Sequence, residues 1–328
     1  MKNNILKIFF LIFIFCNINL VQADSVKLGL GSCLDQDYPQ PIWESIKKEN
    51  LNYFIFLGDN VYGDSYSGNL RKMKKAYEKQ EKALPNFLNQ IQIYAIWDDH
   101  DFGVNDGGED YKNKVKSKKM FLDFWEVPIE DERNFREGVY FSTEKIFHEK
   151  KFKLIFLDTR YFRSELMGNK GNYIANTSEG ATILGNEQWG WFKNQLNTEF
   201  DFLIIFSSIQ IIATEHGYEK WSNFPNDRKK LFDMLEQYKD KTLLFSGDRH
   251  RSGIYKKNGI TEITSSSLNK PGSLFKETDT YLIGETYPEV NYSILEIFRD
   301  SLDVQIKNKS GTILNSIKIK SNFFYINL

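Results

Sequence analysis

The chain has 328 residues, of which 41% are hydrophobic and 27% are charged. This length and content support a full core in one large α/β domain, which we favour over two small ones. Lysine and arginine number 43 against 44 acidic residues, so no global basic field points to nucleic acid or an anionic membrane as the main partner.

Residues 1–23 are predicted to form a secretory signal peptide that is removed. Lys2 and Lys7 lead into the apolar run Ile8–Phe15, and Val21-Gln22-Ala23 places small residues where a signal peptidase cleaves. The run is shorter than the roughly 20 apolar residues that a spanning helix needs. We therefore expect a secreted or periplasmic protein without a transmembrane segment, whose single mature domain covers residues 24–328.

The two cysteines have different expected fates. Cys16 leaves with the signal unless it carries an acyl anchor, although Phe13 stands where a lipoprotein signal usually has Leu. Cys33 is then the only thiol and forms no internal disulfide. A lone Cys is usually a small buried hydrophobe, but Cys33 follows the first predicted strand, where a thiolate would reach a metal site.

Short apolar runs without clean alternation predict strands that are buried on both faces. They are Val26–Leu30, Tyr53–Leu57, Ile91–Trp97, Leu154–Leu157, Phe202–Phe206 and Thr242–Phe245. Helix-like stretches separate them: Pro41–Glu49, Asn69–Asn89, Lys114–Trp125, Asn186–Leu196 and Asp227–Tyr238. This alternation predicts a mainly parallel sheet layered with helices.

The end of the chain predicts an antiparallel meander. Its expected strands are Glu262–Ser267, Ser293–Phe298, Leu302–Lys307 and Ile313–Lys320. A second sheet packed on the first would give a four-layer α/β/β/α sandwich. The stretch Ser164–Leu184, which is rich in Gly, Asn and Ser, is expected to be a surface loop near the active site.

Three segments place residues of metal-ligand type at predicted strand ends. They are Gly58-Asp59-Asn60-Val61-Tyr62-Gly63-Asp64, Ile96-Trp97-Asp98-Asp99-His100-Asp101 and Phe245-Ser246-Gly247-Asp248-Arg249-His250. Carboxylate oxygens and imidazole nitrogens suit hard or borderline cations, and clustered carboxylates repel one another without one. The pattern favours a metal-assisted hydrolase.

Together with Gly31-Ser32-Cys33, these motifs resemble those of the alkaline phosphatase D-like (PhoD-like) family of calcineurin-like metallophosphoesterases, in the same order along the chain. The resemblance implies that Asp59 bridges two metal ions. Cys33, Tyr62 and His250 would hold one ion, and Asp99 and Asp248 the other.

The resemblance also implies a site of two or three ions, with Fe³⁺ and Ca²⁺ as the expected metals. Thiolate and phenolate ligands favour ferric iron, and the extra carboxylates favour calcium. Zn²⁺ or Mn²⁺ remains an alternative. The expected reaction is attack on phosphorus by a hydroxide held between the ions, with His100 protonating the leaving alkoxide and Asp101 or Asp64 orienting its ring.

Further residues are weaker candidates for substrate binding. Arg160, at another strand end, would grip a phosphate oxygen or else form an ion pair with Asp158 or a neighbour. Asn105 would bind phosphate or the second ion, unless it only shapes a turn. Gln210, His216, Trp221 and Arg228 would line the substrate side.

Two competing patterns are set aside. Asp99–Gly103 resembles an EF-hand loop, but Gly103 occupies a ligand position and no Glu closes the loop. The aromatic content of 15% would suit stacking on sugars or bases, yet most Phe residues fall inside apolar runs and indicate core.

The sequence thus predicts an exported phosphoesterase acting on phosphomonoesters or phosphodiesters. Small phosphate esters, nucleotides, phospholipid headgroups and wall polymers are all candidate substrates. The rival is a noncatalytic exported protein that binds metal or phosphate esters on the same scaffold, which would have no need of a leaving-group acid.

Overall fold

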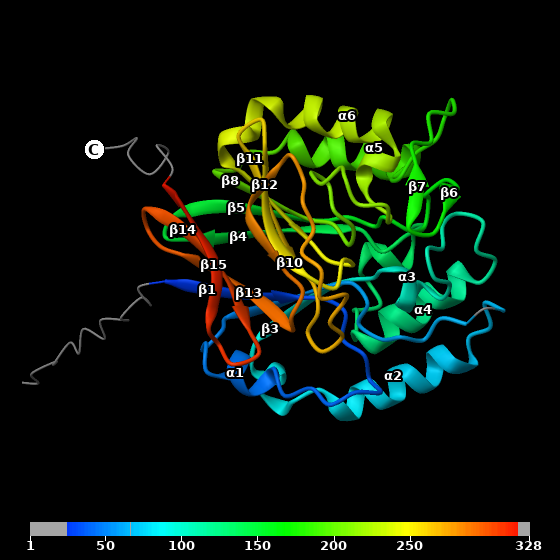
Figure 1. Cartoon of the computed structure of the whole chain (residues 1–328), viewed down its shortest axis with the longest axis horizontal. Helices are drawn as coiled ribbons and strands as arrows, with labels where there is room; N and C mark the ends of the chain where they lie inside the picture. Colours follow the sequence, from blue (N-terminus) through cyan, green and yellow to red (C-terminus); the bar gives the residue numbers. More distant parts are fainter. Residues whose placement is uncertain (1–24, 66, 321–328) are drawn as a thin grey trace, which may run out of the picture.

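The computed structural model describes residues 25–65 and 67–320, so the predicted signal peptide and Cys16 lie outside the described residues. Two large β-sheets face each other. Figure 1 shows α5 (Gly185–Leu196) and α6 (Pro225–Leu235) outside one sheet, and α1 (Trp43–Lys47) and α2 (Arg71–Ala83) outside the other. The four-layer α/β/β/α architecture expected from the sequence is confirmed.

The first sheet has the strand order β15-β14-β13-β1-β2-β3. Its strands are β1 (Val26–Gly31), β2 (Tyr53–Leu57), β3 (Gln92–Ile96), β13 (Asn291–Ile297), β14 (Ser301–Asn308) and β15 (Ile313–Lys320). β1, β2 and β3 are parallel, whereas β13 pairs antiparallel with β1 and begins the C-terminal meander.

The second sheet has the order β12-β10-β11-β9-β8-β5-β4. Its strands are β4 (Phe141–Phe147), β5 (Lys150–Phe156), β8 (Phe202–Phe206), β9 (Thr242–Ser246), β10 (Ser252–Lys257), β11 (Ile260–Ser265) and β12 (Leu282–Tyr287). The central four, β5, β8, β9 and β11, are parallel.

Alternating side chains of single strands build the layers. In β2, Ile55 and Leu57 point into the core between the sheets, whereas Phe54 and Phe56 pack under the outer helices. Because successive side chains of a strand point to opposite faces, an unbroken apolar run serves both layers. On the inner face of the second sheet, the Phe156 ring stacks on Phe206, with centroids 4.5 Å apart.

The helices bury one face each. In α2 the buried residues Met73, Ala76, Tyr77 and Gln80 follow the helical period. The remaining helices are α3 (Asp99–Phe102), α4 (Lys114–Phe124), η1 (Asn86–Gln90), η2 (Glu132–Asn134), η3 (Trp221–Asn223) and η4 (Glu236–Lys241). Within the described ranges, none of the helices has the length and apolar character needed to cross a bilayer.

Two expectations about the strands need correction. The parallel strands do not form one sheet, because β1–β3 belong to the first sheet and β5, β8, β9 and β11 to the second. The expected meander strand Glu262–Ser267 is β11, which pairs with β9 and β10 in the second sheet. The meander therefore extends the first sheet, and the second sheet is built largely from the middle of the chain.

The stretch Ser164–Leu184, expected to be a loop, carries a small hairpin. It consists of β6 (Met167–Asn169) and β7 (Asn172–Ile174), which pair antiparallel. Tyr173 N–H donates to the Gly217 carbonyl at 2.8 Å, which fixes the hairpin against another loop. The hairpin thus holds a defined position beside α3 (Figure 1).

Candidate metal centre

The turns that follow β1, β2 and β9 share an unusual backbone conformation. Cys33, Asp59, Asp248 and His250 all have positive φ, at 57°, 52°, 62° and 51°. Residues other than glycine rarely adopt this left-handed backbone conformation. Residues that do adopt it are often found at functional sites. Each of these four predicted ligands belongs to at least one of two neighbouring groups of side chains at the ends of the strands.

Cys33, Asp59, Tyr62 and His250 meet there. The Asp59 Oδ2 atom lies 3.5 Å from Cys33 Sγ and 3.2 Å from the Tyr62 hydroxyl, and that hydroxyl lies 3.2 Å from His250 Nε2. The Lys270 carbonyl lies 2.6 Å from His250 Nδ1, which leaves Nε2 facing the cluster. These are the four residues expected at the first ion.

Asp59 also belongs to a second group. One carboxylate oxygen from each of Asp59, Asp98, Asp99 and Asp248 lies within 4.8 Å of all the others. Asp98 Oδ2 and Asp99 Oδ1 are buried and have no hydrogen-bond partner among the described residues. Buried carboxylate oxygens without donors are costly, so this donor set fits a bound cation.

The pKa values of these groups without metal also support a cation site. Burial raises the pKa of Asp59 well above its ordinary value, although the charge of His100 opposes the rise. Burial likewise raises the pKa of the Cys33 thiol to about 11 and that of Asp248 to about 6. Cations at this point would replace the missing solvation and favour the charged forms that act as ligands.

His100 lies at the edge of both groups. Its Nδ1 is 2.7 Å from Asp64 Oδ1, and its ring centroid is 4.2 Å from that of Tyr62. Burial alone would lower the pKa of His100, but Asp99, Asp59 and Asp64 outweigh burial and raise it to about 10. The raised pKa favours the protonated imidazole, which can donate a proton.

Asp64, rather than Asp101, orients the His100 ring. Asp101 is fully buried and accepts from the Asp98 backbone N–H at 2.5 Å, as well as from the Asn60 side chain. Burial raises the pKa of Asp101 to about 7. Its contacts fix the turn between β3 and α3, which carries Asp98 and Asp99.

Arg160 is completely buried and faces carboxylates. Its Nε donates to Asp98 Oδ1 at 2.6 Å, and its Nη1 pairs with Glu219. Glu219 also contacts Arg163, with Oε1 2.8 Å from Nε. Both sides of the guanidinium thus meet acidic partners, which fits the ion pair with a neighbour that the sequence offered as the alternative to a phosphate contact. Asp158 contacts the backbone instead, because its Oδ1 accepts from the Arg160 N–H at 2.9 Å.

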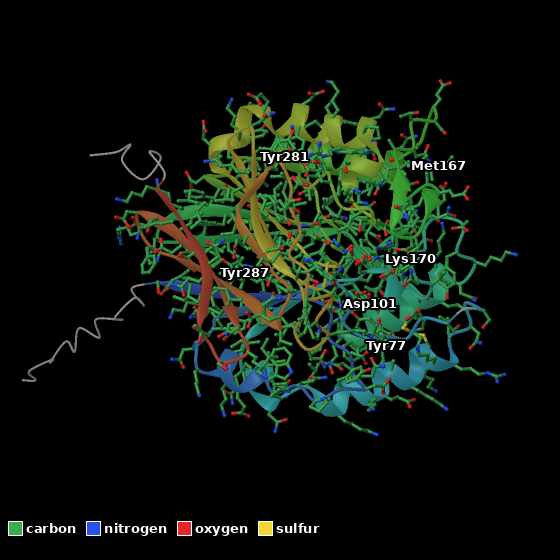
Figure 2. The ribbon with its side chains drawn as sticks, viewed as in Figure 1. Tyr77, Asp101, Met167, Lys170, Tyr281 and Tyr287 are labelled. Atoms are coloured by element: carbon green, nitrogen blue, oxygen red, sulfur yellow. The ribbon has the colours of Figure 1, made fainter. Side chains whose placement is uncertain are left out.

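Asn105 lines a cavity beside the second group. Its Oδ1 accepts from Lys170 Nζ at 2.8 Å, and the following Asp106 N–H donates to Asp99 Oδ2 at 2.6 Å. The cavity measures about 590 Å³ and lies between this turn and the β6–β7 hairpin, which contributes Lys170 and Tyr173. Figure 2 shows Lys170 and Asp101 on the same side of the molecule.

The other substrate-side candidates hold structural contacts. Gln210 is buried and donates to Thr264, while Trp221 donates to Ser207. The Arg228 guanidinium donates to the carbonyls of residues 211 and 212. These contacts fix the loop after β8, and none of the three residues is in the two ligand groups.

His216 differs from these three in its surroundings. Its Nδ1 accepts from the Tyr218 N–H at 3.2 Å, and its Nε2 is buried without a partner among the described residues. Burial and the charges of Arg249 and Lys220 lower the pKa of His216 well below its ordinary value. The lowered pKa favours the neutral ring, and His216 is in neither of the two ligand groups.

Sequence reasoning missed three residues of the site. Asp98 was passed over in favour of Asp99, although an Asp-Asp pair at a strand end already signalled two carboxylates. The Ser266 hydroxyl lies 3.0 Å from Cys33 Sγ, and Lys270 Nζ lies 3.6 Å from the centre of the Tyr62 ring. No sequence pattern marks Ser266 or Lys270, because only the fold brings them to the cluster.

The fold of the chain is similar to that of several solved structures. The chain is similar to the solved structure of PhoD, with a TM-score of 0.69 and 15% identity over 92% of this chain and 72% of that one. It is also similar to GAP50, described as the anchor in the inner membrane complex of Plasmodium, with a TM-score of 0.62 and 13% identity over 91% and 89% of the chains.

A third similar structure is the purple acid phosphatase PPD1 from yellow lupin seeds, with a TM-score of 0.57 and 14% identity over 94% of this chain and 56% of that one. At these identities the likeness shows the fold alone. A search of curated proteins gave no match. The family model for PhoD-like phosphatase, however, matches residues 28–312, and the chain therefore belongs to the PhoD-like phosphatase family.

Proposed function

We propose that the protein is an exported metal-dependent phosphoesterase that hydrolyses phosphomonoesters, phosphodiesters or both. The proposal depends mainly on one observation: the predicted ligand residues lie close together at the ends of the strands, beside the proton donor His100. Membership of a phosphatase family supports the reaction class. Export through a Sec-type signal, to the periplasm or beyond the cell, rests on residues 1–23 of the sequence.

The residues that would hold the first ion are Cys33, Asp59, Tyr62 and His250. Asp59, Asp99 and Asp248 would hold the second, with Asp98 beside them. We propose Fe³⁺ for the first position and Ca²⁺ for the second, since thiolate and phenolate suit the former and carboxylates the latter. When bound, such cations neutralise charge on phosphoryl oxygens and activate water.

The chain's own residues then complete the chemistry. As the bond between phosphorus and the ester oxygen breaks, that oxygen needs a proton to leave as an alcohol, and His100 would supply it from Nε2. The contact with Asp64 orients the ring and leaves Nε2 for the substrate. The cavity beside Asp106 would receive the alcohol part of the substrate.

Metal analysis of the purified protein, combined with hydrolysis of a nitrophenyl phosphate monoester and a bis-nitrophenyl phosphate diester, tests this proposal. Hydrolysis that depends on bound metal is expected. The two rates would also separate monoester from diester preference. A metallated protein that turns over neither ester would instead support the noncatalytic binding role.

We expect Cys33→Ser to lower bound iron and turnover together. A hydroxyl is a poorer ligand than a thiolate for ferric iron, and the loss should exceed the roughly 10–100-fold that losing an outer contact to a metal site costs. Metal content and turnover are measured on the same sample. Full metal with no turnover would indicate covalent thiol chemistry, and full activity would leave Cys33 structural.

Chelation should act in two stages if the second ion is calcium. Oxygen ligands hold calcium flexibly, so a calcium-selective chelator should remove it and abolish activity while iron remains. Adding calcium back alone should restore turnover. Restoration by zinc or manganese where calcium fails would overturn the calcium assignment and leave the phosphoesterase proposal intact.

A further inference from the structure

The loop between β11 and β12, whose backbone is seen in Figure 1, carries two large apolar side chains that are exposed to solvent. Leu274 is 85% exposed and its neighbour Phe275 is 84% exposed. Exposed apolar residues are ordinary when they stand alone, but two adjacent and almost fully exposed ones form a patch that needs an explanation. The patch lies in the loop that also contacts His250.

The backbone of this loop is fixed to the metal centre. Gly272 N–H donates to the His250 carbonyl at 3.0 Å, and the Lys270 carbonyl lies 2.6 Å from the ring of the same histidine. The buried Arg251 donates from Nη1 to the Phe275 carbonyl at 2.7 Å. These bonds hold Leu274 and Phe275 outward at a defined place beside the site.

The lysines that flank the apolar pair are neutralised. Lys270 Nζ lies 2.5 Å from Asp35 Oδ2, and Lys276 pairs with Glu285. With these partners the loop offers apolar area and little net charge. An occupant of the loop therefore has to be attracted by burial of Leu274 and Phe275, and not by a counter-charge.

Two exposed tyrosines lie beside cationic side chains of residues that neighbour this histidine. The Tyr38 ring lies 5.9 Å from Lys270 Nζ, and the Tyr218 ring lies 4.5 Å from the guanidinium carbon of Arg249, which precedes His250. Tyrosine is enriched where a protein meets the boundary between lipid and water, because its ring is apolar and its hydroxyl is polar.

We infer that Leu274 and Phe275 form a lipid-docking tip, which inserts into the surface of a phospholipid bilayer and turns the metal centre toward the headgroups. A protein partner would need about 800 Å² and roughly 20–30 residues on each side, far more than two apolar side chains and two tyrosines provide. A bilayer surface accepts a small apolar tip and places tyrosines at its boundary. The inference goes beyond the proposed function and does not depend on hydrolysis.

Tryptophan reporters in the full chain test the inference. Phe275→Trp, added to phosphatidylcholine vesicles whose acyl chains carry bromine, should show a blue-shifted and quenched emission beyond that of the six native tryptophans. Phe135, 77% exposed between α4 and β4, gives the matched reporter Phe135→Trp, which should stay unquenched. Both variants carry the same N-terminal apolar run, so this run cannot produce the difference.

A paired substitution measures the contribution of the tip. Leu274→Ser with Phe275→Ser should weaken vesicle binding by about 10–100-fold, as expected for two partly buried apolar side chains, and salt should change this loss little. Ile129→Ser with Phe135→Ser, which removes equally exposed apolar area elsewhere, should leave binding unchanged. Turnover of a soluble nitrophenyl ester should be the same in all these variants.

Several results would overturn the inference. They are quenching of neither reporter, equal quenching of both, or a paired Leu274 and Phe275 variant that binds vesicles like the original chain. A blue shift of Trp at position 275 that grows with protein concentration without vesicles would identify a second copy of the chain as the occupant. If the original chain binds vesicles through this loop but hydrolyses neither nitrophenyl ester, only the proposed function is contradicted.

Discussion

Replacing His100 by Asn is expected to lower turnover by about 10²–10⁴ and to leave bound metal unchanged, as for a positioned general acid. The side chain lies beside the ligand groups, but its Nδ1 is engaged by Asp64. Asn keeps a polar group of similar reach and removes the transferable proton. Turnover and metal content are measured on the same preparation.

The loss should depend on the leaving group. A nitrophenolate leaves without protonation, whereas an alkyl alkoxide does not, so the His100→Asn defect should be larger for an alkyl ester. Equal defects on both esters, or loss of metal, would assign His100 another role. Asp64→Asn is the companion variant, and it should give a smaller defect of the same kind because it only loosens the ring.

The pH profile gives an independent check. The pKa of His100 is raised to about 10 by its acidic neighbours, so the imidazole is protonated below that pH and loses its proton as the pH rises through it. Cations on those carboxylates would lower this pKa. We therefore expect turnover of an alkyl ester to fall at alkaline pH with a midpoint at or below about 10, and the fall should disappear in His100→Asn.

The residues of the candidate metal centre could be predicted because they stand at the ends of apolar runs. β2 and β8 were predicted with their observed bounds, and Asp59 lies two residues after the end of β2. Parallel strands carry their C-terminal ends to one edge, where ligand sites form. Position after a strand was therefore enough to predict that Cys33, Asp59, Asp99 and Asp248 lie close together, although it did not show that β9, which precedes Asp248, belongs to the other sheet.

The roles of Arg160 and of the loop after β8 could not be predicted in the same way. A basic residue at a strand end is equally compatible with binding phosphate and with forming an ion pair. Which role Arg160 has depends on Glu219, which is far away in the sequence. Gln210 also lies after a strand, but its loop folds back and buries it against Thr264. Such contacts are set by tertiary packing.

Strand assignment failed for similar reasons. β4, β10 and β12 were missed because their residues mix Lys, Glu and Thr with apolar side chains, as strands toward a sheet edge do. The division of the parallel strands between two sheets was also missed. Each central strand is apolar on both faces, so its sequence does not say which neighbour it pairs with.

Arg160→Met is expected to destabilise the fold by about 3–5 kcal/mol, the usual cost of removing one partner from a buried ion pair. Methionine fills much of the space but leaves the Asp98 carboxylate with the Ser208 hydroxyl and Glu219 with Arg163. The free energy of unfolding in urea measures the loss. Arg299→Met is the matched control, because Arg299 and its partner Glu149 are exposed and should contribute less than about 1 kcal/mol.

The dependence of this loss on pH identifies its cause. Burial raises the pKa of Asp98 and of Glu219, and Arg160 opposes the rise in both. Without Arg160 the folded protein binds protons at these groups more tightly than the unfolded chain does, so stability falls as the pH rises. The deficit of Arg160→Met should therefore be smaller at mildly acidic than at alkaline pH. A deficit that is independent of pH would point to lost packing, and one below about 1 kcal/mol would show that the buried pair contributes no more than an exposed one.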